Sequence, residues 1–85
     1  MYLIGDIGNT ETKICLFNNK KKLLKKIILN TAKIKNSNFY NDLKFMGPYG
    51  KKIKKIIFSS VVPEVFRKLK RMIKNKFKLE IKELK

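Results

Sequence analysis

The sequence contains no histidine, no tryptophan and a single cysteine among its 85 residues. Without histidine, the chain cannot form a Ser-His-Asp triad, a Cys-His nucleophile pair or any site in which an imidazole moves the proton. One cysteine cannot form an internal disulfide, and without histidine it cannot build a zinc site of the usual Cys/His kind. The cysteine, Cys15, stands in an apolar stretch, so we expect it to be a core residue in a reducing compartment.

Long apolar runs are missing as well. No segment reaches the roughly 18 apolar residues that a membrane-spanning helix needs. The first residues include no basic side chain and meet an acid at Asp6, which is unlike a secretory signal peptide. We therefore expect a cytoplasmic protein without a membrane partner. The length allows one small domain or part of a larger one.

Acidic residues are scarce, because 22 Lys and Arg stand against 6 Asp and Glu and the formal net charge is +16. Such a charge favours nucleic-acid binding, which phosphate neutralisation drives. However, only Arg67 and Arg71 are arginines, the residue type that base and bidentate phosphate recognition prefers. A genome rich in A and T would also enrich Lys, Asn and Ile through their codons. We interpret the charge as a solvated surface, and a small basic nucleic-acid-binding module is the alternative function.

The N-terminal part of the chain reads as three strands. A short apolar run begins at Tyr2 and ends at the Gly8-Asn9 turn, and a second β-rich run spans Glu11–Phe17. The short connection between them predicts a β-hairpin. A second turn at Asn18–Lys20 leads to a third strand over Leu23–Thr31. We therefore expect an antiparallel meander.

The middle of the chain is more polar. Residues Lys33–Ser37 are predicted to be a loop. The segment Asn38–Met46 carries apolar residues at helical spacing and a cap residue in Asn38, so a short helix is expected there. The sequence Gly47-Pro48-Tyr49-Gly50 is expected to break that helix.

The C-terminal part predicts a strand, a helix and a strand. The apolar run within Ile53–Val62 is typical of a strand buried on both faces. Pro63 suits the first position of a helix that ends at Asn75. That helix has an apolar stripe, which we assign to core packing, formed by Val65, Phe66, Leu69, Met72 and Ile73. Alternating apolar residues over Phe77–Lys82 predict a last, half-exposed strand.

The expected fold class is therefore α/β, with element order βββαβαβ and an antiparallel meander followed by parallel strands. Two features of this order look incomplete. The last strand runs to Lys85 with almost no closing structure, and the two expected helices barely cover a strand that is buried on both faces. We expect residues 1–85 to be a partial domain.

The stretch from Asp6 to Lys13 carries the chemistry. An apolar strand ends in an Asp, Gly8 permits a tight turn, and Asn9 and Thr10 add polar groups whose backbone N–H groups can bind an anion. A carboxylate suited to Mg²⁺, phosphate donors and a Lys within so short a stretch indicate a nucleotide-phosphate site. The alternative is an ordinary polar hairpin turn. A Walker A loop and a Rossmann fingerprint are excluded, because both need a helix after the glycines.

These residues resemble a known family. Asp6-Ile7-Gly8-Asn9-Thr10 followed by Lys13 is similar to the first phosphate motif of the type III pantothenate kinases. A second similarity follows at the family's spacing, in Ile57-Phe58-Ser59-Ser60-Val61-Val62-Pro63-Glu64. The family belongs to the actin-like, sugar-kinase-like ATPase superfamily. The resemblance therefore implies that residues 1–85 are part of an N-terminal ATPase domain with a ribonuclease-H-like fold.

The resemblance implies ATP-dependent phosphorylation of pantothenate, the first step of coenzyme A synthesis. It implies ATP and pantothenate as substrates, Mg²⁺ and a monovalent cation (K⁺ or NH₄⁺) as cofactors, and a homodimer at full length. Asp6 would position the metal and phosphates, and Lys13 would stabilise the transferred phosphoryl group. The segment that holds the ATP phosphates would comprise Asp6, Ile7, Gly8, Asn9, Thr10, Glu11, Thr12 and Lys13.

The family's catalytic Asp, in a Gly-x-Asp-Arg motif, has no counterpart in this sequence. We therefore assign no catalytic base here and expect the 85 residues alone to be inactive as a kinase. Another kinase of the same superfamily, with a different acceptor, fits the same residues. Ser59 and Ser60 have two interpretations, since they could approach a substrate at a strand end or cap the next helix, and the cap is favoured.

Overall fold

The structure, a computed structural model, describes residues 1–36 and 40–84. Five strands form one mixed sheet in the order β3-β2-β1-β4-β5. The strands are β1 (Tyr2–Ile7), β2 (Glu11–Phe17), β3 (Leu23–Asn30), β4 (Lys55–Ser60) and β5 (Lys82–Glu83). The helices are α1 (Thr31–Asn36), the 3₁₀ helix η1 (Tyr40–Lys52) and α2 (Pro63–Phe77).

The pairing of the strands confirms the expected α/β class. Strands β1, β2 and β3 are antiparallel neighbours, β4 runs parallel to β1, and β5 runs parallel to β4. A meander followed by parallel strands was therefore the right expectation. The element order differs by one helix, because α1 precedes η1 and was expected to be a loop.

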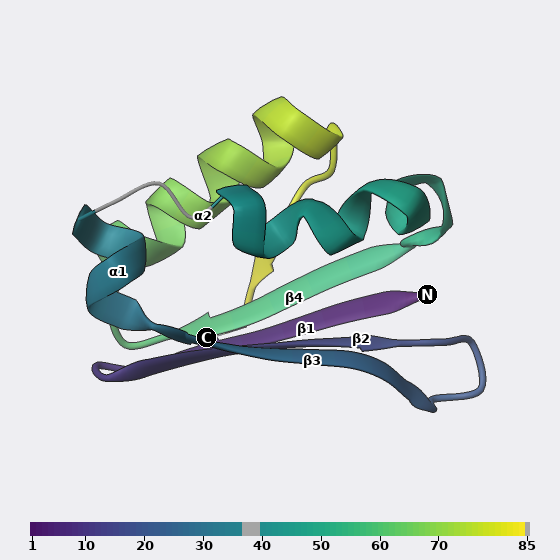
Figure 1. The fold of residues 1–85 in the computed structure, drawn as a ribbon, viewed down its shortest axis with the longest axis horizontal. Helices are drawn as coiled ribbons and strands as arrows, with labels where there is room; N and C mark the ends of the chain where they lie inside the picture. The colour runs from purple at the N-terminus through teal and green to yellow at the C-terminus, as the bar shows by residue number, and fades with distance from the viewer. Residues whose placement is uncertain (37–39, 85) are drawn as a thin grey trace.

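The three helices all lie on the same side of the sheet (Figure 1). The core fills the space between them and the sheet, and in β1 and β2 every second side chain enters it. We call the other side of the sheet the uncovered face. The buried apolar residues are Leu3, Ile7, Ile14, Leu16, Leu29, Ile34, Leu43, Met46, Ile53, Ile56, Phe58, Val65, Phe66, Leu69, Ile73 and Ile81.

Glycine is required at Gly5 of the central strand by packing. The Phe58 ring of β4 lies over this residue, and a Cβ added there would stand 2.2 Å from the ring. Strand β1 therefore accepts Phe58, which is fully buried, only because residue 5 has no side chain.

Two burial expectations were wrong for the same reason. Strand β4 is buried on one face, through Ile56 and Phe58, whereas Ile57 and Ser59 are half-exposed. Cys15 of β2 is also half-exposed and is not a core residue. All three half-exposed residues point to the uncovered face, which no helix of the described residues packs against. Strand periodicity specifies that two faces exist, but it does not specify how many layers cover them.

The expectation of a loop over Lys33–Ser37 was wrong up to Asn36, and Ser37 lies outside the described residues. Helix α1 begins at Thr31, so β3 ends one residue earlier than expected. Asn30 caps the helix, since its Oδ1 accepts a hydrogen bond from the Ala32 amide at 2.9 Å. Ile34 is fully buried and fixes the helix on the core. A single buried position in so polar a stretch gives too little periodicity to be recognised in the sequence.

The expected helix over Asn38–Met46 is instead the 3₁₀ helix η1, and it does not break at the Gly-Pro sequence. Asn38, the expected cap residue, and its neighbour Phe39 lie outside the described residues. Leu43, Met46 and Tyr49 follow one another at every third residue. A 3₁₀ helix has about three residues per turn, so these side chains line one face. Leu43 and Met46 are fully buried and Tyr49 packs against the core, which favours the 3₁₀ geometry over an α-helix.

Helix α2 begins at Pro63 as expected, and its apolar stripe packs on the core with Met72 partly buried. It ends at Phe77, two residues later than expected. Lys78 closes it in the left-handed conformation (φ 59°), and its amide donates to the Lys74 carbonyl at 3.0 Å. The last strand is much shorter than expected, because Phe77 belongs to the helix and β5 spans Lys82–Glu83 alone.

Among the described residues, no helix combines the length and the apolar character that crossing a membrane would require.

The packing at Gly5 predicts that Gly5→Ala destabilises the fold by about 1–3 kcal/mol, because the new methyl group must displace the Phe58 ring. Urea unfolding of the 85-residue chain measures the change in free energy. The control is Gly47→Ala, since nothing lies within 4 Å of a Cβ at that position. The double variant Gly5→Ala, Phe58→Leu should recover part of the loss. An unchanged midpoint for Gly5→Ala would show that the ring does not pack there.

The cap at Lys78 predicts a gain in stability of about 0.5–1 kcal/mol for Lys78→Gly, because glycine adopts positive φ without strain. The matched control is Arg71→Gly in the exposed interior of the same helix, which should lose about 1 kcal/mol. Equal losses in the two variants, measured by urea unfolding, would contradict the left-handed cap.

Candidate functional site

Three side chains from the three central strands meet at one level of the sheet. Asp6 of β1 is the register partner of Lys13 on β2 and of Ser59 on β4. Asp6 and Lys13 are exposed and Ser59 is half-exposed, and all three point to the uncovered face. The sequence motif therefore becomes a row of a cation, a carboxylate and a hydroxyl at the carboxyl ends of the parallel strands β1 and β4. Open α/β sheets bind ligands at such ends.

The Asp6 carboxylate is held by a serine that lies far away in the sequence. Ser59 Oγ donates to Asp6 Oδ1 at 3.0 Å. Ser60 Oγ accepts from the Val62 amide at 3.0 Å, which stabilises the turn ahead of α2. The N-cap of α2 is Val62, and no side chain caps it. The favoured interpretation of the serines as helix caps was therefore wrong, and Ser59 lies in the candidate site instead.

Backbone hydrogen bonds hold the turn between β1 and β2 in place. Just before the turn, the Ile7 carbonyl accepts a hydrogen bond from the Val61 amide at 3.0 Å, next to the end of β4. Within the turn, the Gly8 amide donates to the Glu11 carbonyl at 2.9 Å. Gly8 does not have a positive φ, but a Cβ there would stand 3.1 Å from the Glu11 oxygen, so the turn is tight. Asn9 is exposed at the tip, and its polar groups are accessible.

The eight residues of the predicted phosphate segment do not all present side chains to solvent. Thr10 and Glu11 are exposed beside the tip. The side chains of Ile7 and Thr12 are fully buried on the helix side of the sheet. In a phosphate site, these two residues could contribute only through their backbone.

Sequence reasoning missed Thr31, the first residue of α1. Its amide donates to the Thr10 carbonyl at 2.9 Å, and its hydroxyl donates to the Gly8 carbonyl at 2.8 Å. Thr31 is buried and supports the turn from the helix side. No local pattern indicated this role, because the contact joins residues that are 23 positions apart.

Two of the other acids form ion pairs away from the row, whereas Glu11 is exposed on β2, two residues from Lys13 and on the same face of the sheet. Asp42 pairs with Lys33 at 3.1 Å, and Glu64 pairs with Lys35 at 2.9 Å. Within residues 1–36 and 40–84, no three metal-ligating side chains gather into a cluster. Within the row of Lys13, Asp6 and Ser59, Asp6 offers the one carboxylate. That donor set fits Mg²⁺ held jointly by one carboxylate, phosphates and water, and it does not fit an all-protein metal cage.

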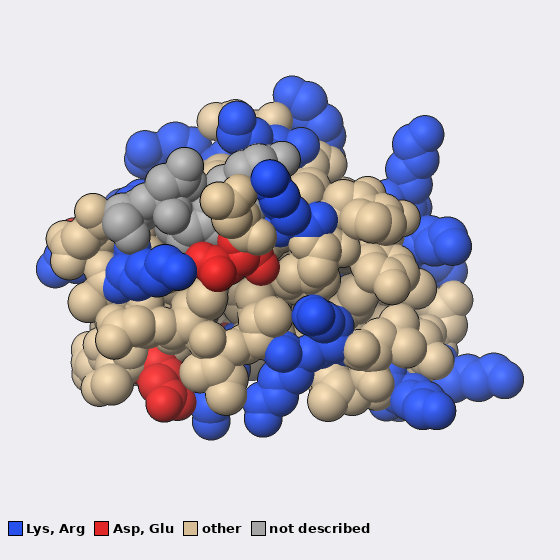
Figure 2. All heavy atoms as spheres, viewed as in Figure 1, with Lys and Arg blue, Asp and Glu red and all other residues tan. Residues whose placement is uncertain are grey.

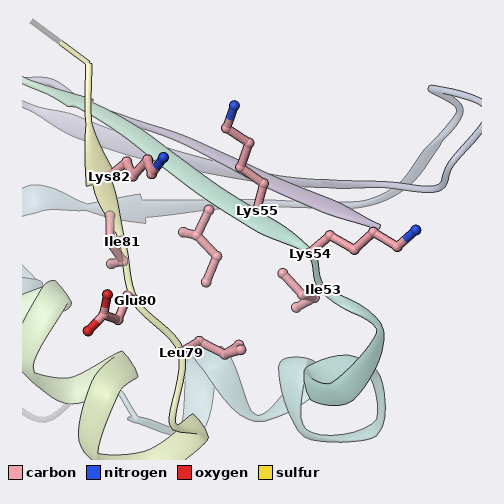
Figure 3. A pocket seen from close by; sticks show the side chains of 8 residues that line it. Ile53, Lys54, Lys55, Leu79, Glu80, Ile81 and Lys82 are labelled. Carbon is pink, nitrogen blue, oxygen red and sulfur yellow. The ribbon is translucent and has the colours of Figure 1, made fainter.

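Two hollows in the surface lie away from this row. One of about 370 Å³ lies between the start of β4 and the segment that leads into β5. In Figure 3, Ile53, Leu79 and Ile81 point into this gap, and the ammonium groups of Lys54 and Lys55 point outward. Its residues are at the opposite end of β4 from Ser59. Another hollow, of about 430 Å³, lies on the uncovered face at the amino end of β1 and is mostly apolar, lined by Tyr2, Ile4, Phe17, Lys21 and Lys55.

The basic side chains do not form one compact patch on the visible face of the molecule. Figure 2 shows lysines and arginines spread around its outline, with acids between some of them. A groove that tracks a nucleic-acid backbone would need them gathered along one path.

Comparisons with known proteins agree with the motif. The family model of the type III pantothenate kinases matches residues 2–85. A type III pantothenate kinase of Pelagibacter ubique (strain HTCC1062) is 45% identical over 85 residues, which is 100% of this chain and 34% of that protein. The chain thus spans about a third of the length of this relative. Because the family model covers nearly every residue, the chain belongs to the type III pantothenate kinase family.

Proposed function

We propose that this chain supplies the ATP-phosphate-binding segment of an enzyme that phosphorylates pantothenate, the first step of coenzyme A synthesis. The observation that carries the proposal is the row of Lys13, Asp6 and Ser59 on the uncovered face, next to the tight turn at Gly8. Family membership and the printed name of the Pelagibacter relative support the choice of pantothenate as acceptor.

Phosphoryl transfer depends mainly on positioning and on charge stabilisation, and the row offers both. Asp6 would hold Mg²⁺ through one oxygen or through water, while the Ser59 hydroxyl fixes the orientation of the carboxylate. Bound Mg²⁺ would neutralise charge on the phosphate oxygens. Lys13 projects from the neighbouring strand at the same level, where its ammonium group would stabilise charge on the transferred phosphoryl group.

The backbone of the turn would complete the phosphate site. Asn9 and Thr10 lie at the exposed tip, beside the Asp6 end of β1. N–H groups at such a tip can bind an anion as a nest, without any side chain. Ile7, Glu11 and Thr12 would then shape the segment, and Ile7 and Thr12 would do so from the core.

The proposal includes a wider architecture that the family implies. The sheet would be the first part of a ribonuclease-H-like ATPase domain, and residues 1–85 would be one portion of it. The enzyme would use a monovalent cation, act as a homodimer in the cytoplasm, and take its catalytic base from outside this segment. In keeping with that, Asp42 and Glu64 form ion pairs on the helix side and offer no base near Asp6.

The test replaces the matching segment of the Pelagibacter kinase with this chain and assays ATP-dependent phosphorylation of pantothenate. We expect an active chimera, because the two segments are 45% identical. A folded chimera that hydrolyses ATP but does not phosphorylate pantothenate would indicate a different acceptor. A folded chimera that does not bind MgATP would overturn the proposed function.

Within the active chimera, Asp6→Asn should lower kcat/KM for ATP by about a hundredfold, because the metal–phosphate group loses its carboxylate. The matched control is Asp42→Asn, a carboxylate that pairs with Lys33 away from the row. A similar loss of kcat/KM in both variants would show that Asp6 is not part of the site.

If the Lys13 ammonium group stabilises charge on the transferred phosphoryl group, Lys13→Ala in the active chimera should lower kcat by about tenfold or more. Lys26→Ala is the matched control, since Lys26 is exposed on β3 opposite Cys15 and lies two register positions away from the row. Steady-state kinetics at saturating ATP distinguish the two variants. Equal rates for Lys13→Ala and Lys26→Ala would show that the charge at residue 13 is not used.

A further inference from the structure

Thr31 lies where the end of β3, the start of α1 and the phosphate turn meet. It is 3% exposed, and both its backbone amide and its side-chain hydroxyl form hydrogen bonds. Its amide donates to the Thr10 carbonyl at 2.9 Å, and its Oγ1 donates to the Gly8 carbonyl at 2.8 Å. The same Oγ1 lies 2.9 Å from the buried Oγ1 of Thr12. A single residue thus holds two of the carbonyls of the turn.

The direction of these hydrogen bonds follows from the number of protons. A threonine hydroxyl has one proton to donate, and a carbonyl oxygen has none. The Thr31 proton is therefore used on the Gly8 carbonyl, and the bond between the two hydroxyls must be donated by Thr12. The chain of donors runs from Thr12 to Thr31 to Gly8, and it starts in the core.

This chain determines the direction of an amide at the tip of the turn. The peptide between Gly8 and Asn9 is trans and planar, so its C=O and N–H groups point in opposite directions. The Gly8 carbonyl points to Thr31 on the helix side of the sheet. The Asn9 N–H group therefore points away from the helix side, toward the face that carries Asp6.

The Gly8 carbonyl also does not accept the backbone hydrogen bond that commonly closes a hairpin turn. In a tight hairpin turn, the carbonyl of the first residue commonly accepts from the amide three residues later. Here the Gly8 amide donates to the Glu11 carbonyl. Among the described residues, the reverse bond from the Glu11 amide to the Gly8 carbonyl is not formed, and neither Asn9 nor Thr10 donates its amide to a backbone carbonyl. The turn keeps donors for a ligand.

We propose that Thr31 is a positioning residue for ATP. Its hydroxyl holds the Gly8–Asn9 peptide so that the Asn9 N–H group faces the phosphates, and Thr12 supports it from the core. Thr31 does not touch the nucleotide. The inference rests on the proposed function, because it names the residue that shapes the phosphate turn of the same site.

The test compares Thr31→Val, which keeps the shape and removes the hydroxyl, with Thr31→Ser, which keeps the hydroxyl. In the active chimera, Thr31→Val should raise KM for ATP and the Kd of MgATP by about tenfold, with kcat nearly unchanged. The affected hydrogen bond, from the Asn9 N–H group to a phosphate oxygen, would be made equally in the ground and transition states. Thr31→Ser should stay within about twofold of wild type. Ile34→Val is the control for packing, since Ile34 is a buried residue of the same short helix.

A second readout does not depend on activity. In ¹⁵N-labelled 85-residue chain, the Glu11 amide should exchange with solvent more slowly in Thr31→Val than in wild type, because the freed Gly8 carbonyl lets the turn close. The Asn9 amide resonance should shift on addition of MgATP in wild type and in Thr31→Ser, and much less in Thr31→Val.

The outcomes separate the two claims. If wild type binds MgATP and Thr31→Val binds it equally well, Thr31 has no positioning role and the proposed function stands. If Thr31→Val and Ile34→Val lower kcat alike while KM is constant, the threonine acts only on stability, and the inference is overturned. If wild type does not bind MgATP at all, the proposed function fails, and with it the role of Thr31 toward phosphate.

Discussion

The alternation of side chains along the central strand β1 is the constraint on which the rest of the structure depends. Leu3 and Ile7 enter the core, and Gly5 leaves room there for the Phe58 ring. Since successive side chains of a strand point to opposite faces, Asp6 must point to the uncovered face. A shift of one residue in the pairing would bury the carboxylate and expose the core residues. The hydrophobic core and the candidate site are therefore two consequences of one register.

The helices contribute to the candidate site mainly by positioning Thr31 beside the turn between β1 and β2. Helix α2 packs its apolar stripe on the sheet, and α1 lies next to α2 through Lys35, whose side chain pairs with Glu64. That position brings Thr31, the first residue of α1, to the Gly8 and Thr10 carbonyls of the turn between β1 and β2. A short helix in a polar stretch thereby connects the packed core to the turn at the carboxyl end of β1. The links are one ion pair between α1 and α2 and two hydrogen bonds from Thr31 to the turn.

Charge alone does not distinguish Lys13 from the other lysines. The chain has 22 basic residues, and most of them are exposed. Lys13 differs from the others in its register, because it is the cross-strand partner of Asp6. Opposite charges at such positions attract each other modestly, by roughly 0.2–1 kcal/mol. What distinguishes Lys13 is therefore its place beside a carboxylate, a hydroxyl and a turn with available amides.

The sequence by itself determined the strands of the hairpin, helix α2 and the motif from Asp6 to Lys13, because these depend on periodicity and turn residues within a few positions. It did not reveal α1, the 3₁₀ geometry of η1 or the half-exposed face of β4, because each depends on which layers pack against which face. The contact of Ser59 with Asp6 spans 53 positions, and that of Thr31 with Gly8 spans 23. Only the tertiary structure decided these contacts, since strand order and helix placement bring the residues together and no local pattern encodes that proximity.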